Sequence, residues 1–334
     1  MRTESPEAMR IGETDNAGSS RRCALALMLG AGVCRWLEAA ATSAAGGGDA
    51  AGALNNKPIR LALSESLVAD VNLDDARVAM QVWIKQLEKE LRIPIEISPK
   101  VFEPAAEIAR RARGGLFDAV GLNIIEYRQI ADMLDPSQIM AETDAGERYM
   151  LMVKRSGGIR NVGDLRGRRL LMQTGIKMCI ASQWLSTVLN EGHLAQSDQF
   201  FGSVSTEPKA ARVILPVFFG QADACVTSKK SFDLMCELNP QVGKELTALA
   251  DSPDLMVGFE IFHKDYQGAN RDRFAHIYSS AQNTATESPS RKQLSTLFHF
   301  DSVGIKDFAS LRPALALLEK AERISDGPGR PNSK

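Results

Sequence analysis

The sequence predicts an α/β protein with two doubly wound lobes joined by two hinge crossings. Two observations lead to this fold class. From Ile59 onward, short apolar runs alternate with helical patterns that are apolar on one face, which is typical of a sheet covered by helices. The same alternation starts again at Tyr149, and a further strand and three helical patterns follow Met256. At roughly 100–200 residues per domain, 334 residues are enough for two cores.

The order of the two patterns also predicts where the lobes begin and end. We expect lobe I to be discontinuous, because the segment after Met256 returns to complete the first pattern. Ligands bind at the carboxyl ends of strands in such sheets, so we expect a site between the lobes. The expected segments are lobe I at 57–145 plus 255–325, lobe II at 146–254, and crossings near 142–148 and 251–255.

The elements of lobe I follow from periodicity and breakers. Apolar residues from Ala76 to Leu91 recur every three or four positions, which predicts one face of a long helix, and Pro94 ends it. Pro104 begins a second helix that ends at Gly114. The predicted strands are 59–63, 95–98 and 117–122.

The elements of lobe II follow by the same rules. Residues from Ala181 to Leu189 predict a helix that ends at Gly192, and Pro216 is expected to kink the helix of residues 210–218. The predicted strands of lobe II are 149–153, 170–172 and 222–226, and a strand of lobe I ends at His263. The last helix is expected at 307–324, and the Gly-, Pro- and Ser-rich tail at 326–334 is expected to be disordered.

The N-terminus has the features of an export signal. Ser20-Arg21-Arg22 precedes an apolar run from Cys23 to Cys34, and small Ala and Gly residues follow. The run is about a dozen residues, shorter than the roughly 20 that a membrane span needs. We therefore expect an export signal and linker at 1–45 and a periplasmic protein, with the arginine pair indicating the twin-arginine route.

Charge and cysteine content exclude several classes. Forty basic and 41 acidic residues give a formal net charge of -1 without a long basic run, which argues against nucleic-acid binding. The three cysteines outside the signal match no zinc or redox spacing, so we expect buried free thiols, with a Cys225–Cys236 disulfide as the alternative. The four histidines are widely separated, and no catalytic or nucleotide-binding motif occurs. We expect no metal, no cofactor and no enzymatic activity.

Several motifs carry a resemblance to a known family. They are Arg148-Tyr149-Met150-Leu151-Met152-Val153-Lys154-Arg155, Gly158-Ile159, Asp164-Leu165-Arg166-Gly167-Arg168-Arg169-Leu170, Phe219-Gly220-Gln221-Ala222-Asp223-Ala224, and Phe117-Asp118-Ala119 followed by Tyr127. In this order they resemble the phosphate-, phosphite- and phosphonate-type periplasmic substrate-binding proteins of ABC importers, over about residues 57–320. The resemblance implies a type II periplasmic binding fold.

The chain departs from that family at the expected anion cradle. The family has a Ser-Thr-Ser-Gly segment there, whose hydroxyl and backbone N–H groups face an anion at a helix N-terminus. The matching stretch here is Gln173-Thr174-Gly175-Ile176-Lys177-Met178-Cys179, in which only Thr174 keeps a hydroxyl and Lys177 adds a cation. Asn123 stands where the family has a glycine four residues before the tyrosine. The resemblance therefore implies the architecture and leaves the ligand open.

The candidate binding residues come from both lobes. Short polar residues follow the first strand, and Tyr127 offers an aromatic face and a hydroxyl. Backbone donors and a positive charge converge at the segment around Lys177, which we take as the anion site. Thr206 is expected to be the N-cap of the next helix, followed by Glu207. The full set is Ser64, Glu65, Ser66, Asn123, Tyr127, Thr174, Gly175, Ile176, Lys177, Thr206 and Thr227.

These observations predict an exported, monomeric solute-binding protein. It would capture a small anionic ligand, similar to phosphonate or phosphate, between the lobes and deliver it to the permease of an ABC importer. The alternative is a sensory protein that presents its ligand to a receptor kinase in the inner membrane, since both functions use the same hinged closure.

Overall fold

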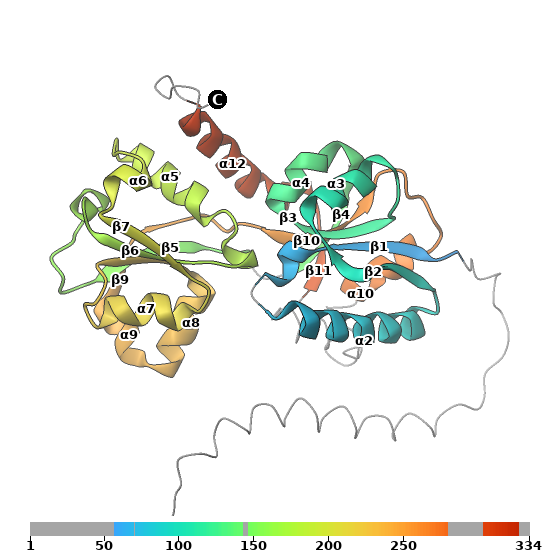
Figure 1. Cartoon of the computed structure of the whole chain (residues 1–334), viewed down its shortest axis with the longest axis horizontal. Coiled ribbons are helices and arrows are strands. Elements are labelled where there is room, and N and C mark those ends of the chain that lie inside the picture. Colours follow the sequence, from blue (N-terminus) through green and yellow to red (C-terminus); the bar gives the residue numbers. More distant parts are fainter. Residues whose placement is uncertain (1–56, 70, 143–145, 280–302, 327–334) are drawn as a thin grey trace, which may run out of the picture. The chain divides into compact units, whose positions relative to one another are not determined.

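The computed structural model describes residues 57–69, 71–142, 146–279 and 303–326. The expected export signal at 1–45 and the tail from 327 lie outside the described residues. Two sheets organise this part of the chain (Figure 1). No helix among the described residues is both long and apolar enough to span a membrane.

The first sheet has six strands in the order β11-β4-β10-β3-β1-β2. β1 pairs in parallel with β2 and β3, as the sequence predicted, but β10 is antiparallel to both β3 and β4, so the sheet is mixed. β4 and β11 were missed, because the polar residues in and beside them obscure the strand pattern. The bounds are β1 (Ile59–Ser64), β2 (Ile95–Glu103), β3 (Ala119–Asn123), β4 (Leu134–Glu142), β10 (Gly258–His263) and β11 (Val303–Lys306).

Helices cover both faces of this sheet (Figure 1). In β1, Leu61 and Leu63 point to the same core as Trp83 of α2, whereas Ala62 points to the core that contains Ile108 of α3. This alternation is the period of two that a strand buried on both faces requires. The helices are α2 (Leu73–Leu91), α3 (Ala105–Arg113), α4 (Ile124–Ile130), α10 (Arg271–Ser279) and α12 (Arg312–Ser325), with short 3-10 helices η1 (Glu65–Val68), η2 (Ala131–Met133) and η6 (Phe308–Leu311).

The second sheet has five strands in the order β7-β6-β8-β5-β9. β6 is parallel to β7 and β8, and β5 is antiparallel to β8 and β9. Its strands all come from the predicted lobe II, and those of the six-stranded sheet all come from lobe I; that the lobes are separate domains stays a prediction. The strands are β5 (Tyr149–Lys154), β6 (Arg169–Gln173), β7 (Ser203–Glu207), β8 (Ala224–Ser228) and β9 (Leu246–Asp251).

The helices of the second sheet also lie on both faces (Figure 1). Trp184 of α5 packs on one side, and Val213 and Val217 of α7 pack on the other. Pro216 lies inside α7, as predicted. The helices are α5 (Ala181–Glu191), α6 (Ser197–Phe200), α7 (Ala210–Phe218), α8 (Lys229–Leu238) and α9 (Pro240–Glu245), with 3-10 helices η3 (Val162–Leu165) and η4 (Ile176–Met178).

The prediction that Thr206 caps a helix is wrong. Thr206 and Glu207 belong to β7, which pairs with β6 along its whole length, and the N-cap of α7 is Lys209. The β-branched Val204 and Thr206 favour this extended backbone. The cysteines Cys179, Cys225 and Cys236 are free thiols.

The two crossings between the sheets are hydrogen-bonded to each other. Glu147 N donates to Leu255 O at 2.8 Å, and Leu255 N donates to Glu147 O at 2.9 Å. Gly146 lies directly against this bridge, and a Cβ atom there would overlap the carbonyl of Leu255. The predicted crossing segments thus form one short antiparallel bridge.

Candidate ligand-binding cleft

A cavity of about 640 Å³ is lined by residues of both sheets and of the crossings. This volume is within the roughly 300–1,000 Å³ of small-molecule sites. The residues after the carboxyl ends of β1, β6 and β8 reach it, which is where ligands bind in open α/β sheets. Its apolar wall consists of Leu67, Val68, Val71, Met140, Ala141, Ile176, Leu234, Leu255, Met256, Val257 and Phe259.

A cluster of charged side chains lies at the crossings. Lys177 Nζ is 3.7 Å from Glu142 Oε2 and 3.4 Å from Glu147 Oε1, and Lys230 Nζ donates a hydrogen bond to Glu142 Oε1. The Glu147 side chain is only 4% exposed, and among the described residues none donates a hydrogen bond to either of its oxygens. Burial raises the pKa of Glu147, and the positive charges of Lys177 and Lys230 partly offset this effect. The two lysines of the cavity wall are therefore already paired with carboxylates.

A second buried carboxylate lies on β10. Glu260 lines the cavity and accepts a hydrogen bond from Tyr278 Oη at 2.7 Å. Burial raises the pKa of Glu260 to about 7, because the charged form is poorly solvated there. Its charge therefore changes close to neutral pH and depends on what else occupies the cavity.

The predicted residues of lobe I form a hydrogen-bond network of their own. Ser64 Oγ donates to Glu126 Oε1 at 2.6 Å, Ser66 Oγ donates to Glu126 Oε2 at 2.9 Å, and Asn123 N donates to Glu126 Oε2 at 3.0 Å. Asn123 Oδ1 in turn accepts from Glu126 N, which completes a capping box at the start of α4. The serine hydroxyls therefore hold a carboxylate of the chain itself.

The other predicted residues lie in varied surroundings. The Tyr127 ring is buried and packs edge-on against Phe259, with ring centroids 5.5 Å apart, and burial raises the pKa of Tyr127. Thr227 Oγ1 donates to Gln173 Oε1 at 2.6 Å, and Thr174 N donates to Glu207 O at 3.0 Å. Gly175 has a φ of 126°, Glu65 lies in the first turn of η1, and Thr206 is exposed.

Two of the eleven predicted residues, Ile176 and Lys177, line the cavity. Ligand contact by all eleven stays a prediction. Sequence reasoning did not include Glu147 among the candidate site residues. Its place in a predicted crossing was the one feature of the sequence that could have indicated it. Glu260 and Tyr278 gave no signal, because their burial depends on the packing of α10 against the six-stranded sheet.

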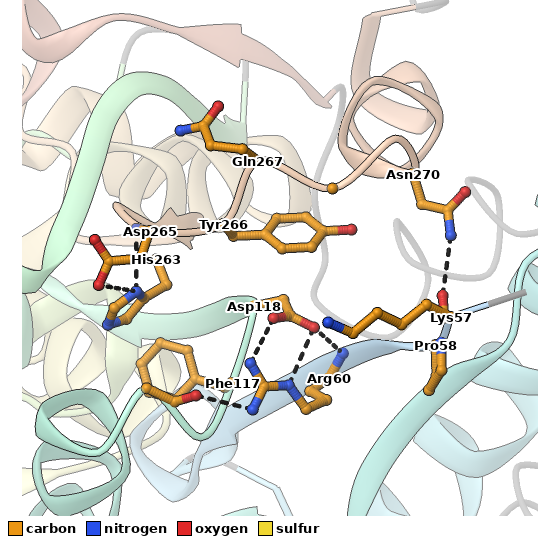
Figure 2. Close-up of a pocket in the computed structure, with 12 residues that line it drawn as sticks. Lys57, Pro58, Arg60, Phe117, Asp118, His263, Asp265, Tyr266, Gln267 and Asn270 are labelled. Carbon is orange, nitrogen blue, oxygen red and sulfur yellow. Dashed lines mark hydrogen bonds and ion pairs between the residues drawn. The ribbon is translucent and has the colours of Figure 1, made fainter. Parts of the chain in front are cut away.

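A smaller pocket of about 220 Å³ lies at the opposite end of β1 (Figure 2). Arg60 fills its floor: Nη2 and Nε donate to the two oxygens of Asp118 at 2.7 and 3.2 Å, and Nη1 donates to Gly115 O at 2.8 Å. Tyr266 lies above this pair (Figure 2), and burial raises the pKa of Tyr266 to about 12. These contacts engage the donors of the Arg60 guanidinium within the chain. The pocket lies between β1 and the loop before α10.

Two α/β sheets with a cavity lined from both, beside paired crossings, define the class of two-lobed solute-binding proteins. The family model described as "ABC transporter, phosphonate, periplasmic substrate-binding protein" matches residues 66–303. The match covers more than half of the chain, and the chain belongs to this family of ABC transporter binding proteins. No curated protein matches the sequence significantly.

Solved structures share this fold at low sequence identity. The complex of PhnD1 from Prochlorococcus marinus with methylphosphonate is 15% identical, with a TM-score of 0.53, and the match covers 80% of this chain and 100% of that one. A chloride-bound protein from Xanthomonas citri is 17% identical, with a TM-score of 0.53 and coverages of 80% and 98%. A phosphonate transporter component from Pseudomonas aeruginosa is 11% identical, with a TM-score of 0.51 and coverages of 81% and 88%. The chain therefore has the type II periplasmic binding fold.

Proposed function

We propose that this protein is exported, captures a small organic ligand between its two sheets, and delivers it to the permease of an ABC importer. The twin-arginine pattern supports the export route, and membership of the family supports the transporter partner. The protein acts as a binding monomer and catalyses no reaction. Methylphosphonate, the ligand in the Prochlorococcus structure, is one compound to test.

The observation that carries this proposal is the cavity of about 640 Å³ with walls from both sheets and both crossings. A ligand that touches both walls favours the closed arrangement by the difference between its affinities for the closed and open states. The described residues of the crossings join through the two backbone hydrogen bonds between Glu147 and Leu255 and through Arg148, whose Nε donates to Asp254 Oδ1 at 3.1 Å. This small connection suits a hinge between the sheets.

The test is a pair of substitutions at Gly258. This residue lines the cavity at the start of β10, and a Cβ atom there would lie 3.6 Å from Ile176 Cγ1, an ordinary contact. Gly258→Ala therefore leaves the cavity open, whereas Gly258→Trp fills it. The protein is first screened by thermal shift against phosphonates, phosphate, sulfonates, amines and neutral metabolites, and the strongest ligand is then titrated by calorimetry.

We expect the ligand to bind the Gly258→Ala variant with nearly the original affinity and to lose at least 100-fold in affinity for the Gly258→Trp variant. Saturation at 100 times the Kd should stabilise the original protein by about 2.7 kcal/mol. Equal affinity for the two variants would place the ligand elsewhere and contradict the proposal.

A further inference from the structure

The side chains that line the cavity include more carboxylates than ammonium groups. Five carboxylate residues line it, namely Glu142, Glu147, Asp233, Glu237 and Glu260. Two ammonium groups of the lining face them, those of Lys177 and Lys230, and both are paired with Glu142; Asp233 is paired with Lys229 beside the lining. An anion that entered this space would meet an excess of carboxylates, and repulsion between like charges is stronger near a protein than in bulk water.

Glu147 is the strongest single feature of this field. Its side chain is 4% exposed, and its two oxygens accept no hydrogen bond from the residues that the structure describes. Its one described partner, Lys177, is shared with Glu142. A buried carboxylate without hydrogen bonds is costly, so a donor that reaches it from the cavity would gain more than the same donor in water.

Glu260 adds a second acceptor on the six-stranded sheet. Tyr278 Oη satisfies one of its oxygens, Oε2, and the same residue lines the cavity. Glu147 and Glu260 stand on either side of the apolar segment Leu255–Phe259, which lines the cavity as well. Carboxylates at the crossing and on β10 thus flank an apolar wall.

The two serine hydroxyls at and just after the end of β1, which the sequence predicted as ligand contacts, are engaged by a carboxylate of the chain. Ser64 and Ser66 both donate to Glu126, and neither lines the cavity. The carboxylate of Glu126 occupies the position at these hydroxyls that an anionic ligand would need. An anion at these two hydroxyls would have to displace a buried carboxylate that accepts three hydrogen bonds.

We infer that the ligand is an organic cation: a protonated amine on an apolar body, with its N–H donors toward Glu147, in the negative field to which Glu260 adds. The apolar body packs between Leu67, Met140 and Phe259. This inference rests on the proposed function, because it names the chemistry of the ligand that the cleft captures. It differs from the anionic ligand that the sequence around Lys177 predicts.

The experiment compares probes of matched shape and different charge by isothermal titration calorimetry. The central set is phenethylamine, 2-phenylethanol and benzylphosphonate, extended by primary amines of increasing apolar size with their neutral and phosphonate counterparts. We expect at least one cation to bind about 10-fold more tightly than its neutral counterpart, or about 1.4 kcal/mol, and the matched phosphonate to bind most weakly. A phosphonate that binds more tightly than its matched cation, or a panel in which no cation binds, overturns the inference.

Two isosteric substitutions localise the charge. Glu147→Gln should weaken binding of the cation about 10-fold and leave binding of the neutral counterpart unchanged. Glu107→Gln is the matched control, because Glu107 pairs with Arg110 on α3 and does not line the cavity. Equal loss of the cation and the neutral probe in Glu147→Gln would indicate a change of shape and overturn the charge assignment. Should Glu147→Gln fail to fold, Glu260→Gln, which keeps an acceptor for Tyr278, takes its place with the same expected loss.

The two proposals fail in distinguishable ways. If Gly258→Trp abolishes binding of a ligand that proves to be an anion, the cleft function stands and the cation inference is wrong. If a cation binds equally to the Gly258→Ala and Gly258→Trp variants, the cleft is not its site and the proposed function is contradicted as well.

Discussion

The Glu126 network allows a sharp test of how lobe I is built. Removal of the carboxylate by Glu126→Ala deletes three hydrogen bonds, from Ser64 Oγ, Ser66 Oγ and Asn123 N, at 2.6, 2.9 and 3.0 Å. A hydrogen bond to a charged group contributes about 1.5–3 kcal/mol, and such values do not add fully. The hydroxyls can rotate toward other acceptors, whereas the buried backbone N–H of Asn123 cannot. We therefore expect a loss of about 3–5 kcal/mol in the free energy of unfolding.

The assay is equilibrium unfolding in urea, monitored by circular dichroism. The variant Glu126→Gln serves as the control: it keeps one acceptor oxygen and should lose about 1–2 kcal/mol. Formate or acetate added to Glu126→Ala should recover part of the loss, because the anion can accept from the donors of Ser64 and Ser66. It should leave the original protein unchanged. A loss below about 1 kcal/mol in Glu126→Ala, or an equal effect of formate on both proteins, would refute this account of the network.

Three further predictions concern other parts of the chain. The folded-state pKa of Glu260 is about 7, above its ordinary value of 4.5, so between these pH values the folded protein binds a proton that the unfolded chain does not. The free energy of unfolding should therefore fall as the pH rises from about 4.5 to about 7. Thermal unfolding across this range should show a flatter dependence of Tm on pH in Glu260→Gln, and an unchanged dependence would contradict the assignment. Gly146→Ala should lower the Tm by several degrees because its Cβ would overlap Leu255 O, while Gly258→Ala, with ordinary contacts only, should not; equal Tm values would argue against the close approach at the crossings. Arg60→Lys should cost about 1–2 kcal/mol in urea unfolding and leave ligand affinity intact, and a weaker affinity would show that the small pocket takes part in binding.

The sequence predicted the long and periodic elements well. The helix around Trp83 was confirmed, because apolar residues that recur every three or four positions from Ala76 to Leu91 leave little ambiguity. The crossing near 142–148 was also predicted from the restart of the pattern. By contrast, β7 was missed because Ser203–Glu207 is a short, mostly exposed strand with a single large apolar residue.

The candidate site was harder to predict for a physical reason. Ser64 and Glu126 are 62 positions apart, so the sequence shows two polar residues near strand ends and not the hydrogen bond that joins them. Lys177 lines the cavity, but its pairing with Glu142 and Glu147 depends on how the crossings bring distant segments together. Charge balance around a cavity is a property of the folded protein, and local spacing does not reveal it.

The central claim is that the ligand lies between the two sheets, against the crossings. A crystal structure of the protein with the strongest ligand from the screen tests this claim most directly. The account predicts ligand density in the cavity of about 640 Å³, in contact with Glu147, with Phe259 of the six-stranded sheet and with Ile176 of η4, which follows β6 of the five-stranded sheet. Density in the small pocket beside Arg60, or contact with only one sheet, would contradict it.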